Sequence, residues 1–100
     1  MNMRTLRDGV DWMGVVDWDR RVFDALIPLP DGTSYNSYFI RGRDKCALLD
    51  TSDPATVAAF EPQLAALPRV DYVISHHSEQ DHSGLIPLAL ERFQIGRAHV

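Results

Sequence analysis

Four side chains that can bind metal ions lie within six consecutive residues of this 100-residue chain. They are His77, Glu79, Asp81 and His82. If the segment begins in an extended conformation, alternate side chains turn to one side, so the first three share a face and a turn then adds His82. Imidazole and carboxylate ligands together suit zinc, iron and manganese. Two of each kind exceed the needs of one open catalytic site, so the spacing predicts two adjacent metal ions about 3.5–4 Å apart.

The alternative for these residues is a polar, solvated loop whose carboxylates cap a helix and whose histidines are incidental. Charged groups this dense repel each other unless a cation joins them, which favours the metal site. His76 precedes the pattern. It points away from the other side chains if the preceding strand continues through it, so we expect it beside the ligands or at the surface rather than on a metal ion.

The flanking elements predict where this segment lies in the fold. Residues 70–75 are rich in β-branched and aromatic side chains, which favours a strand. Ser83 is a suitable N-cap and Pro87 is tolerated in a first turn, so a helix is expected from there to Phe93. The four side chains then lie at the C-terminal end of a buried strand, where α/β proteins place their sites.

Three further strands are expected upstream, at residues 10–16, 35–40 and 45–49, with a hairpin turn between the last two. Trp18 and Phe23 follow the first strand, and we expect both in the core, with contact to a ligand as the alternative. The resulting order β-β-β-α-β-α predicts an α/β (α+β) fold with a mixed sheet. This order suits one half of an αββα sandwich.

Two aspartates precede the expected helix between the third and fourth strands. Asp50 ends the third strand, where it either orients a site residue or caps the next segment. Asp53 as N-cap and Pro54 at the first helical position predict the helix start. Pro62 predicts a kink or two short helices, because an interior proline costs about 3 kcal/mol.

Composition narrows the class of protein. With 45% hydrophobic and 24% charged residues, the chain resembles a soluble globular protein. The net charge of -4 disfavours a nucleic acid or an anionic membrane as a partner. No signal peptide is evident, and no apolar run approaches the ~20 residues of a membrane span. Cys46 is the only cysteine, which excludes an internal disulfide and a cysteine-based metal site. We expect a cytoplasmic protein.

The ligand pattern after a hydrophobic strand resembles the metallo-β-lactamase fold. Hydrolases of that fold usually carry histidine where this chain has Glu79. The glutamate form, followed by Ser83-Gly84 and a proline-containing helix, is similar to the flavodiiron proteins, which reduce dioxygen or nitric oxide. The resemblance continues upstream at residues 14–18, 31–40 and 47–51. It covers about residues 10–93.

This resemblance implies a non-haem diiron oxidoreductase that reduces dioxygen to water or nitric oxide to nitrous oxide. His77 and Glu79 would hold one iron ion, and Asp81 and His82 the other, with no catalytic residue separate from these ligands. An FMN in a downstream domain would supply electrons from rubredoxin or a rubredoxin reductase. The full-length protein would be a homodimer or homotetramer.

Two other functions stay open. One is a hydrolase of the same fold, in which a metal-bound hydroxide attacks an ester, amide or phosphodiester. The other is a diiron module that binds or senses oxygen. Glu79 adds a hard anionic donor, which favours iron or manganese over the zinc of the hydrolases.

The ends of the chain carry a further prediction about domain organisation. Residues 1–94 are expected to be the N-terminal part of a truncated domain, inactive alone and with one sheet face left uncovered. Residues 95–100 match the translation of a common sequencing adapter, so we expect read-through on a gene fragment, with few contacts. His99 is for that reason not counted as a ligand.

Overall fold

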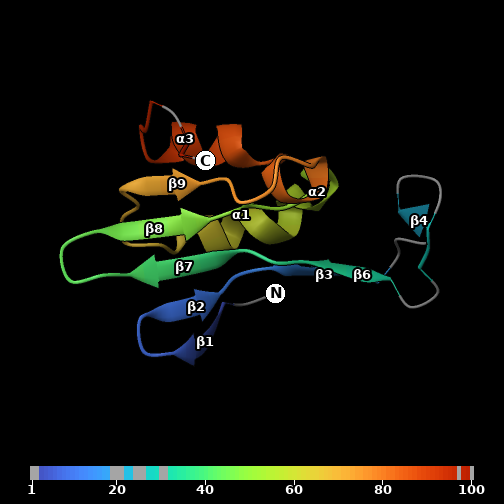
Figure 1. The fold of residues 1–100 in the computed structure, drawn as a ribbon, viewed down its shortest axis with the longest axis horizontal. Helices are drawn as coiled ribbons and strands as arrows, with labels where there is room; N and C mark the ends of the chain where they lie inside the picture. The colour runs from blue at the N-terminus through green and yellow to red at the C-terminus, as the bar shows by residue number, and fades with distance from the viewer. Residues whose placement is uncertain (1–2, 19–21, 24–26, 30–31, 97, 100) are drawn as a thin grey trace.

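A five-stranded mixed sheet forms the framework of the chain (Figure 1). The structure is a computed structural model, and it describes residues 3–18, 22–23, 27–29, 32–96 and 98–99. The strands lie in the order β1 (Arg4–Arg7), β2 (Val10–Trp12), β7 (Tyr38–Arg41), β8 (Cys46–Leu49) and β9 (Tyr72–Ile74). Neighbouring strands are antiparallel except β8 and β9, which run parallel.

The parallel pair β8–β9 requires a crossover, and a helix supplies it. The chain leaves β8 through the 3-10 turn η1 (Pro54–Thr56) and the helix α1 (Val57–Ala65), which crosses behind the sheet in Figure 1. The short helices α2 (Gln80–Ser83) and α3 (Ile86–Arg92) follow β9. This arrangement confirms the predicted mixed α/β fold.

Hydrogen bonds around Asp71 align the start of β9 with β8. The Asp71 carboxylate accepts the N–H of Cys46, and the Asp71 N–H donates to the Cys46 carbonyl. Arg69 donates a hydrogen bond to the same carboxylate. That bond lowers the pKa of Asp71, and the bond from Cys46 lowers it further.

The core lies between one face of the sheet and the helices. Phe39, Leu48 and Val73 occupy paired positions on β7, β8 and β9 and are at most 1% exposed. The other buried hydrophobic residues are Met13, Val15, Tyr35, Phe60, Leu64, Leu67, Val70, Leu85 and Ala89. Burial of α1 and α3 side chains with the strand residues holds both helices on this face.

Apolar side chains also line the opposite face of the sheet. Ile40, Ala47 and Tyr72 occupy paired positions there. Ile40 is 36% exposed and Tyr72 is 41% exposed. In an αββα sandwich, a second sheet would cover this face. The sequence predicted one half of such a sandwich.

Two predicted strands are divided in the structure. The strand expected at residues 10–16 forms β2 and then β3 (Val15–Asp17), and the one expected at residues 35–40 forms β6 (Thr33–Tyr35) and β7. The breaks face each other, because β3 and β6 pair with one another outside the main sheet. At the break the Met13 N–H donates to the Ser37 carbonyl. A further small pair joins β4 (Val22–Phe23) to β5 (Ile27–Pro28).

Asp53 and Pro54 begin the crossover helix as predicted. The Asp53 carboxylate accepts the Ala55 N–H at 2.9 Å. Of the two alternatives expected at Pro62, a kink or two short helices, the second is wrong, since α1 runs through Pro62. Pro62 removes one hydrogen bond, the one to the carbonyl of Ala58, and Ala58 is exposed, so water can satisfy that carbonyl.

Two other local predictions are wrong. Ser83 is the last residue of α2 rather than an N-cap, and its hydroxyl donates to the carbonyls of Ser78 and Glu79. Trp18 is 67% exposed and lies outside the core. The side chain of Phe23 lies outside the described part of the structure.

The C-terminal residues make more contacts than expected. Ile95 and Ala98 pack against the core. His99 forms a parallel bridge with Ile74, and its N–H donates to the Val73 carbonyl at 2.7 Å. The expectation of few contacts at residues 95–100 is therefore wrong, because the edge of β9 offers backbone groups for pairing. Their origin in adapter read-through stays a prediction. In the described residues no helix has the length and apolar character to cross a membrane.

The exposed apolar face predicts self-association of the 100-residue chain. Ile40→Thr keeps a β-branched side chain and reduces the apolar area, so the weight-average mass in sedimentation velocity should fall toward that of a monomer. Val57→Thr is the matched control, because Val57 is 39% exposed but lies on α1. Equal masses for both variants and the unmodified chain would contradict the role of this face.

Candidate metal centre

The four predicted ligands lie between β9 and α3, two of them on an irregular segment and two on a short helix. His77 and Glu79 lie on the irregular segment after β9, and Glu79 is the N-cap of α2 with φ -65° and ψ 150°. Asp81 and His82 lie on α2 itself. The predicted extended start therefore holds only for the first part, and a helical turn places the second part.

The structure brings the four side chains together as two histidine–carboxylate pairs. His77 Nε2 lies 3.5 Å from a carboxylate oxygen of Glu79, and His82 Nε2 lies 3.3 Å from one of Asp81. The rings of His77 and His82 are adjacent, with centroids 5.3 Å apart. Within the described residues, no group of three or more His, Cys, Asp or Glu side chains converges as a complete metal site.

One atom in this cluster lacks a partner that a cation would provide. Asp81 Oδ1 is buried and, within the described part of the chain, accepts no hydrogen bond. A buried, unsatisfied carboxylate oxygen is costly, and coordination of a metal ion removes that cost. With the nearby imidazole nitrogen of His82, the donor set fits iron, manganese or zinc. The residues present thus fit a metal ion, with other ligands needed to complete each coordination sphere.

Asp50 holds the beginning of the ligand segment in place. It ends β8 in the left-handed region, with φ 59°, and is 7% exposed. Its Oδ1 accepts the N–H of His76 at 2.8 Å and that of His77 at 3.4 Å. Of the two roles expected for Asp50, the structure supports the one in which it orients site residues, while Asp53 performs the capping.

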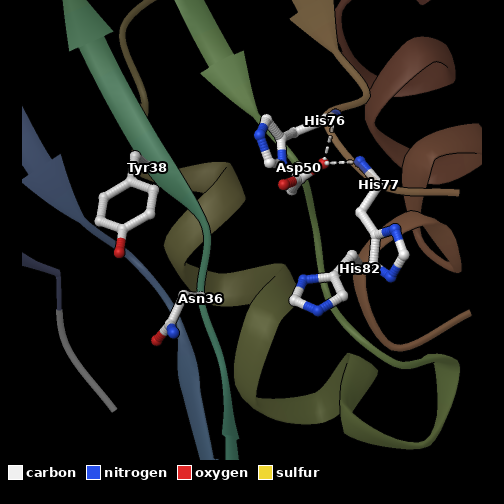
Figure 2. A pocket seen from close by; sticks show the side chains of 6 residues that line it. All are labelled: Asn36, Tyr38, Asp50, His76, His77 and His82. Atoms are coloured by element: carbon white, nitrogen blue, oxygen red, sulfur yellow. Dashed lines mark hydrogen bonds between the residues drawn. The ribbon is translucent and has the colours of Figure 1, made fainter. Parts of the chain in front are cut away.

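His76 lies where the sequence predicted. Figure 2 shows its ring on the other side of Asp50 from the rings of His77 and His82. Its side chain is exposed and makes no ion pair with a described residue. β9 ends at Ile74 and the chain bends at His76, so the expected continuation of the strand through His76 is wrong, and His76 lines the pocket together with His77 and His82.

An open pocket of about 490 Å³ lies beside the histidines. Asn36, just before β7, and Tyr38, the first residue of β7, form its other wall (Figure 2). Asn36 Oδ1 accepts a hydrogen bond from the indole N–H of Trp12 at 3.0 Å. The family resemblance at residues 31–40 includes both residues, but the sequence did not place them at the site, since the antiparallel pairing of β7 with β8 is what brings Tyr38 there.

Comparison with known proteins identifies the family. The family model of the metallo-β-lactamase superfamily matches residues 30–100. The chain belongs to this superfamily. A coenzyme F420H2 oxidase from Methanothermobacter marburgensis is 40% identical over 96 residues, which cover 90% of this chain and 23% of that protein. The chain spans less than a quarter of the length of the curated relatives that it matches.

Solved structures place the chain beside the flavodiiron members of the superfamily. The flavodiiron protein from Giardia intestinalis has a TM-score of 0.82 and 28% identity, over 94% of this chain and 23% of that one. The rubredoxin oxygen:oxidoreductase from Desulfovibrio gigas has a TM-score of 0.84 and 29% identity, over 92% of this chain and 23% of that one. The predicted resemblance to flavodiiron proteins is confirmed by these neighbours.

The contacts of Asp50 predict different effects for three substitutions. Asp50→Ala removes both hydrogen bonds and places alanine in a left-handed conformation, so the free energy of unfolding should fall by about 1–3 kcal/mol. Asp50→Gly removes the bonds without backbone strain, and Asp50→Asn keeps an acceptor, so both should lose less. Urea unfolding measures the order. Unchanged hydrogen-exchange protection of the His76 and His77 amides in the alanine variant would contradict the role of Asp50.

Proposed function

We propose that this chain is part of a non-haem diiron flavoprotein that reduces dioxygen to water or nitric oxide to nitrous oxide. The observation that carries the proposal is the pairing of His77 with Glu79 and of Asp81 with His82, side by side in one cluster. Relatives and structural neighbours named as an F420H2 oxidase, a flavodiiron protein and a rubredoxin oxygen:oxidoreductase support it.

Each pair would supply two ligands to one iron ion. His77 and Glu79 would hold the first ion, and Asp81 and His82 the second. Two donors leave each coordination sphere incomplete, so a longer parent protein would add the remaining ligands. When bound, the two iron ions would transfer electrons to the substrate, and a reduced flavin would replace the electrons that they give up.

The chain's own residues would select and position these ions. The Glu79 carboxylate is a hard, anionic donor, which favours iron over zinc and stabilises the more highly charged oxidised ion. Asp50 fixes the backbone of His77 through its hydrogen bond to that residue. The open pocket beside the rings of His77 and His82 would admit a diatomic substrate.

The proposal extends to the other parts of the parent protein. An FMN in a second domain would pass electrons to the iron ions, and rubredoxin or a rubredoxin reductase would deliver them. The parent would be a cytoplasmic homodimer or homotetramer. The name of the Desulfovibrio gigas neighbour, which pairs rubredoxin with oxygen, supports this choice of donor and substrate.

A substitution at Glu79 tests whether the centre prefers iron or zinc, and therefore whether the parent protein is a reductase or a hydrolase. The parent protein should purify with close to two iron ions per chain. Glu79→His replaces an anionic donor with a neutral one, so iron content should fall, zinc content should rise, and dioxygen or nitric oxide reduction should decrease. Elemental analysis and an oxygen electrode measure these quantities. Glu61→His, at an exposed position on α1, is the control and should change none of them.

A substitution at Asp81 tests whether the four ligands are divided between two ions. Asp81→Ala removes one ligand of the second ion only, so the variant should retain about one iron ion per chain instead of two. Asp44→Ala, in the exposed turn between β7 and β8, is the control for loss of a carboxylate. Retention of two iron ions, or loss of both, in Asp81→Ala would refute the assignment.

A further inference from the structure

Thr51 connects the end of β8 to the far end of the ligand segment. It follows Asp50 in the chain and is fully buried. Its N–H donates to the His82 carbonyl at 2.7 Å, and its hydroxyl donates to the same carbonyl at 2.8 Å. The hydroxyl in turn accepts the N–H of Leu85 at 3.1 Å. Three hydrogen bonds therefore join Thr51 to the segment that carries His82.

These bonds explain why α2 and α3 are separate helices. In an unbroken helix the carbonyl of His82 would accept the N–H of residue 86. Thr51 occupies that carbonyl instead, at the point where α2 ends with Ser83 and α3 begins at Ile86. Because the Thr51 hydroxyl also satisfies the N–H of Leu85, both sides of the break have partners and the position of His82 is fixed.

Two adjacent residues thus hold both ends of the ligand segment. Asp50 accepts N–H groups at its beginning, from His76 and His77, and Thr51 donates to a carbonyl at its end, that of His82. The two anchors are adjacent in the sequence, so one peptide unit fixes the separation of their Cα atoms. The rings of His77 and His82, one near each end of the anchored segment, have centroids 5.3 Å apart.

We propose that Thr51 is a positioning residue for His82. The Thr51 hydroxyl sets the separation between the two histidine–carboxylate pairs. The inference rests on the proposed function, because that function makes His82 a metal ligand. Thr51 touches neither metal nor substrate and acts through the His82 backbone. It would govern the affinity of the ion held by Asp81 and His82 more than that of the ion held by His77 and Glu79.

Two substitutions of Thr51 distinguish the effect of its hydroxyl from the effect of its side-chain shape. Thr51→Val keeps the volume and the branching but removes the hydroxyl, which leaves the Leu85 N–H without its partner. Thr51→Ser keeps the hydroxyl and removes one methyl group. A purely structural role in packing would make the serine variant the more damaged of the two, whereas the positioning role predicts the reverse order.

The metal-free chain gives the first readout. NMR cross-relaxation between the ring protons of His77 and His82 reports their proximity, and hydrogen exchange reports the Leu85 N–H. Thr51→Val should weaken the ring contact and expose the Leu85 amide, while Thr51→Ser should preserve both. A valine variant that keeps the ring contact overturns the inference. If the valine variant does not fold, a serine variant that loses the ring contact overturns it as well.

A titration of the parent protein with Co²⁺ alone gives the second readout, because the parent would supply the ligands that complete each coordination sphere. Loss of a group that orients a ligand typically lowers metal affinity about 10–100-fold, so Kd for the weaker of the two Co²⁺ ions should rise about tenfold or more in Thr51→Val and stay unchanged in Thr51→Ser. Thr56→Val is the matched control, because its hydroxyl bonds Ser52 and the Asp53 carbonyl and touches no ligand residue.

The two readouts separate this inference from the proposed function. Weak ring contact and weak Co²⁺ binding in Thr51→Val, with both intact in Thr51→Ser and Thr56→Val, support it. An unmodified parent protein that binds no Co²⁺, while Thr51→Val still loses the ring contact, supports the positioning role and counts against the metal centre. Equal losses in Thr51→Val and Thr56→Val overturn the inference, since general destabilisation would then explain them.

Discussion

The path of the chain after β9 depends on one buried carboxylate. Asp50 adopts a left-handed conformation, which costs free energy in any residue with a side chain. The polar groups of Asp50 itself have partners. Its carboxylate accepts two N–H groups, its N–H donates to the Ile74 carbonyl, and its carbonyl accepts a hydrogen bond from the Ser37 hydroxyl. These bonds keep the strained residue in place, and they turn the segment so that His77 faces His82.

The sheet links this local arrangement to the overall architecture. Tyr38, Leu49 and Ile74 occupy paired positions on three strands, on the same face as the exposed Ile40 and Tyr72. Tyr38 also lines the pocket beside the histidines. The exposed apolar face and the candidate metal site are therefore adjacent, so a layer that covered this face would also lie against the site.

Local chemistry made much of this chain predictable. The clustering of the four candidate ligands, the cap at Asp53, the hairpin and the strand before the candidate ligands each depend on residues close in sequence. The hydrogen bonds between Asp50 and His76, and between Thr51 and both His82 and Leu85, join residues 26 to 34 positions apart, and a single sequence carries no signal that pairs them. For the same reason α2 went unpredicted: the sequence placed the N-cap of the following helix at Ser83, whereas α2 ends there and α3 begins at Ile86. Tyr38 reaches the site through strand pairing, and Asn36 lies two residues before it.

The closeness of the four candidate ligands in the sequence has a thermodynamic consequence for the proposed metal centre. An unfolded chain can wrap neighbouring donors around an ion, so metal would bind both the unfolded and the folded states. The ion then stabilises the fold only by the difference between the two affinities, less than the folded-state affinity alone would give. That difference comes from groups that only folding brings to the segment, chiefly the anchors at Asp50 and Thr51. The stabilisation that an added ion confers on the fold is thus a direct measure of how well those two residues preorganise the ligands.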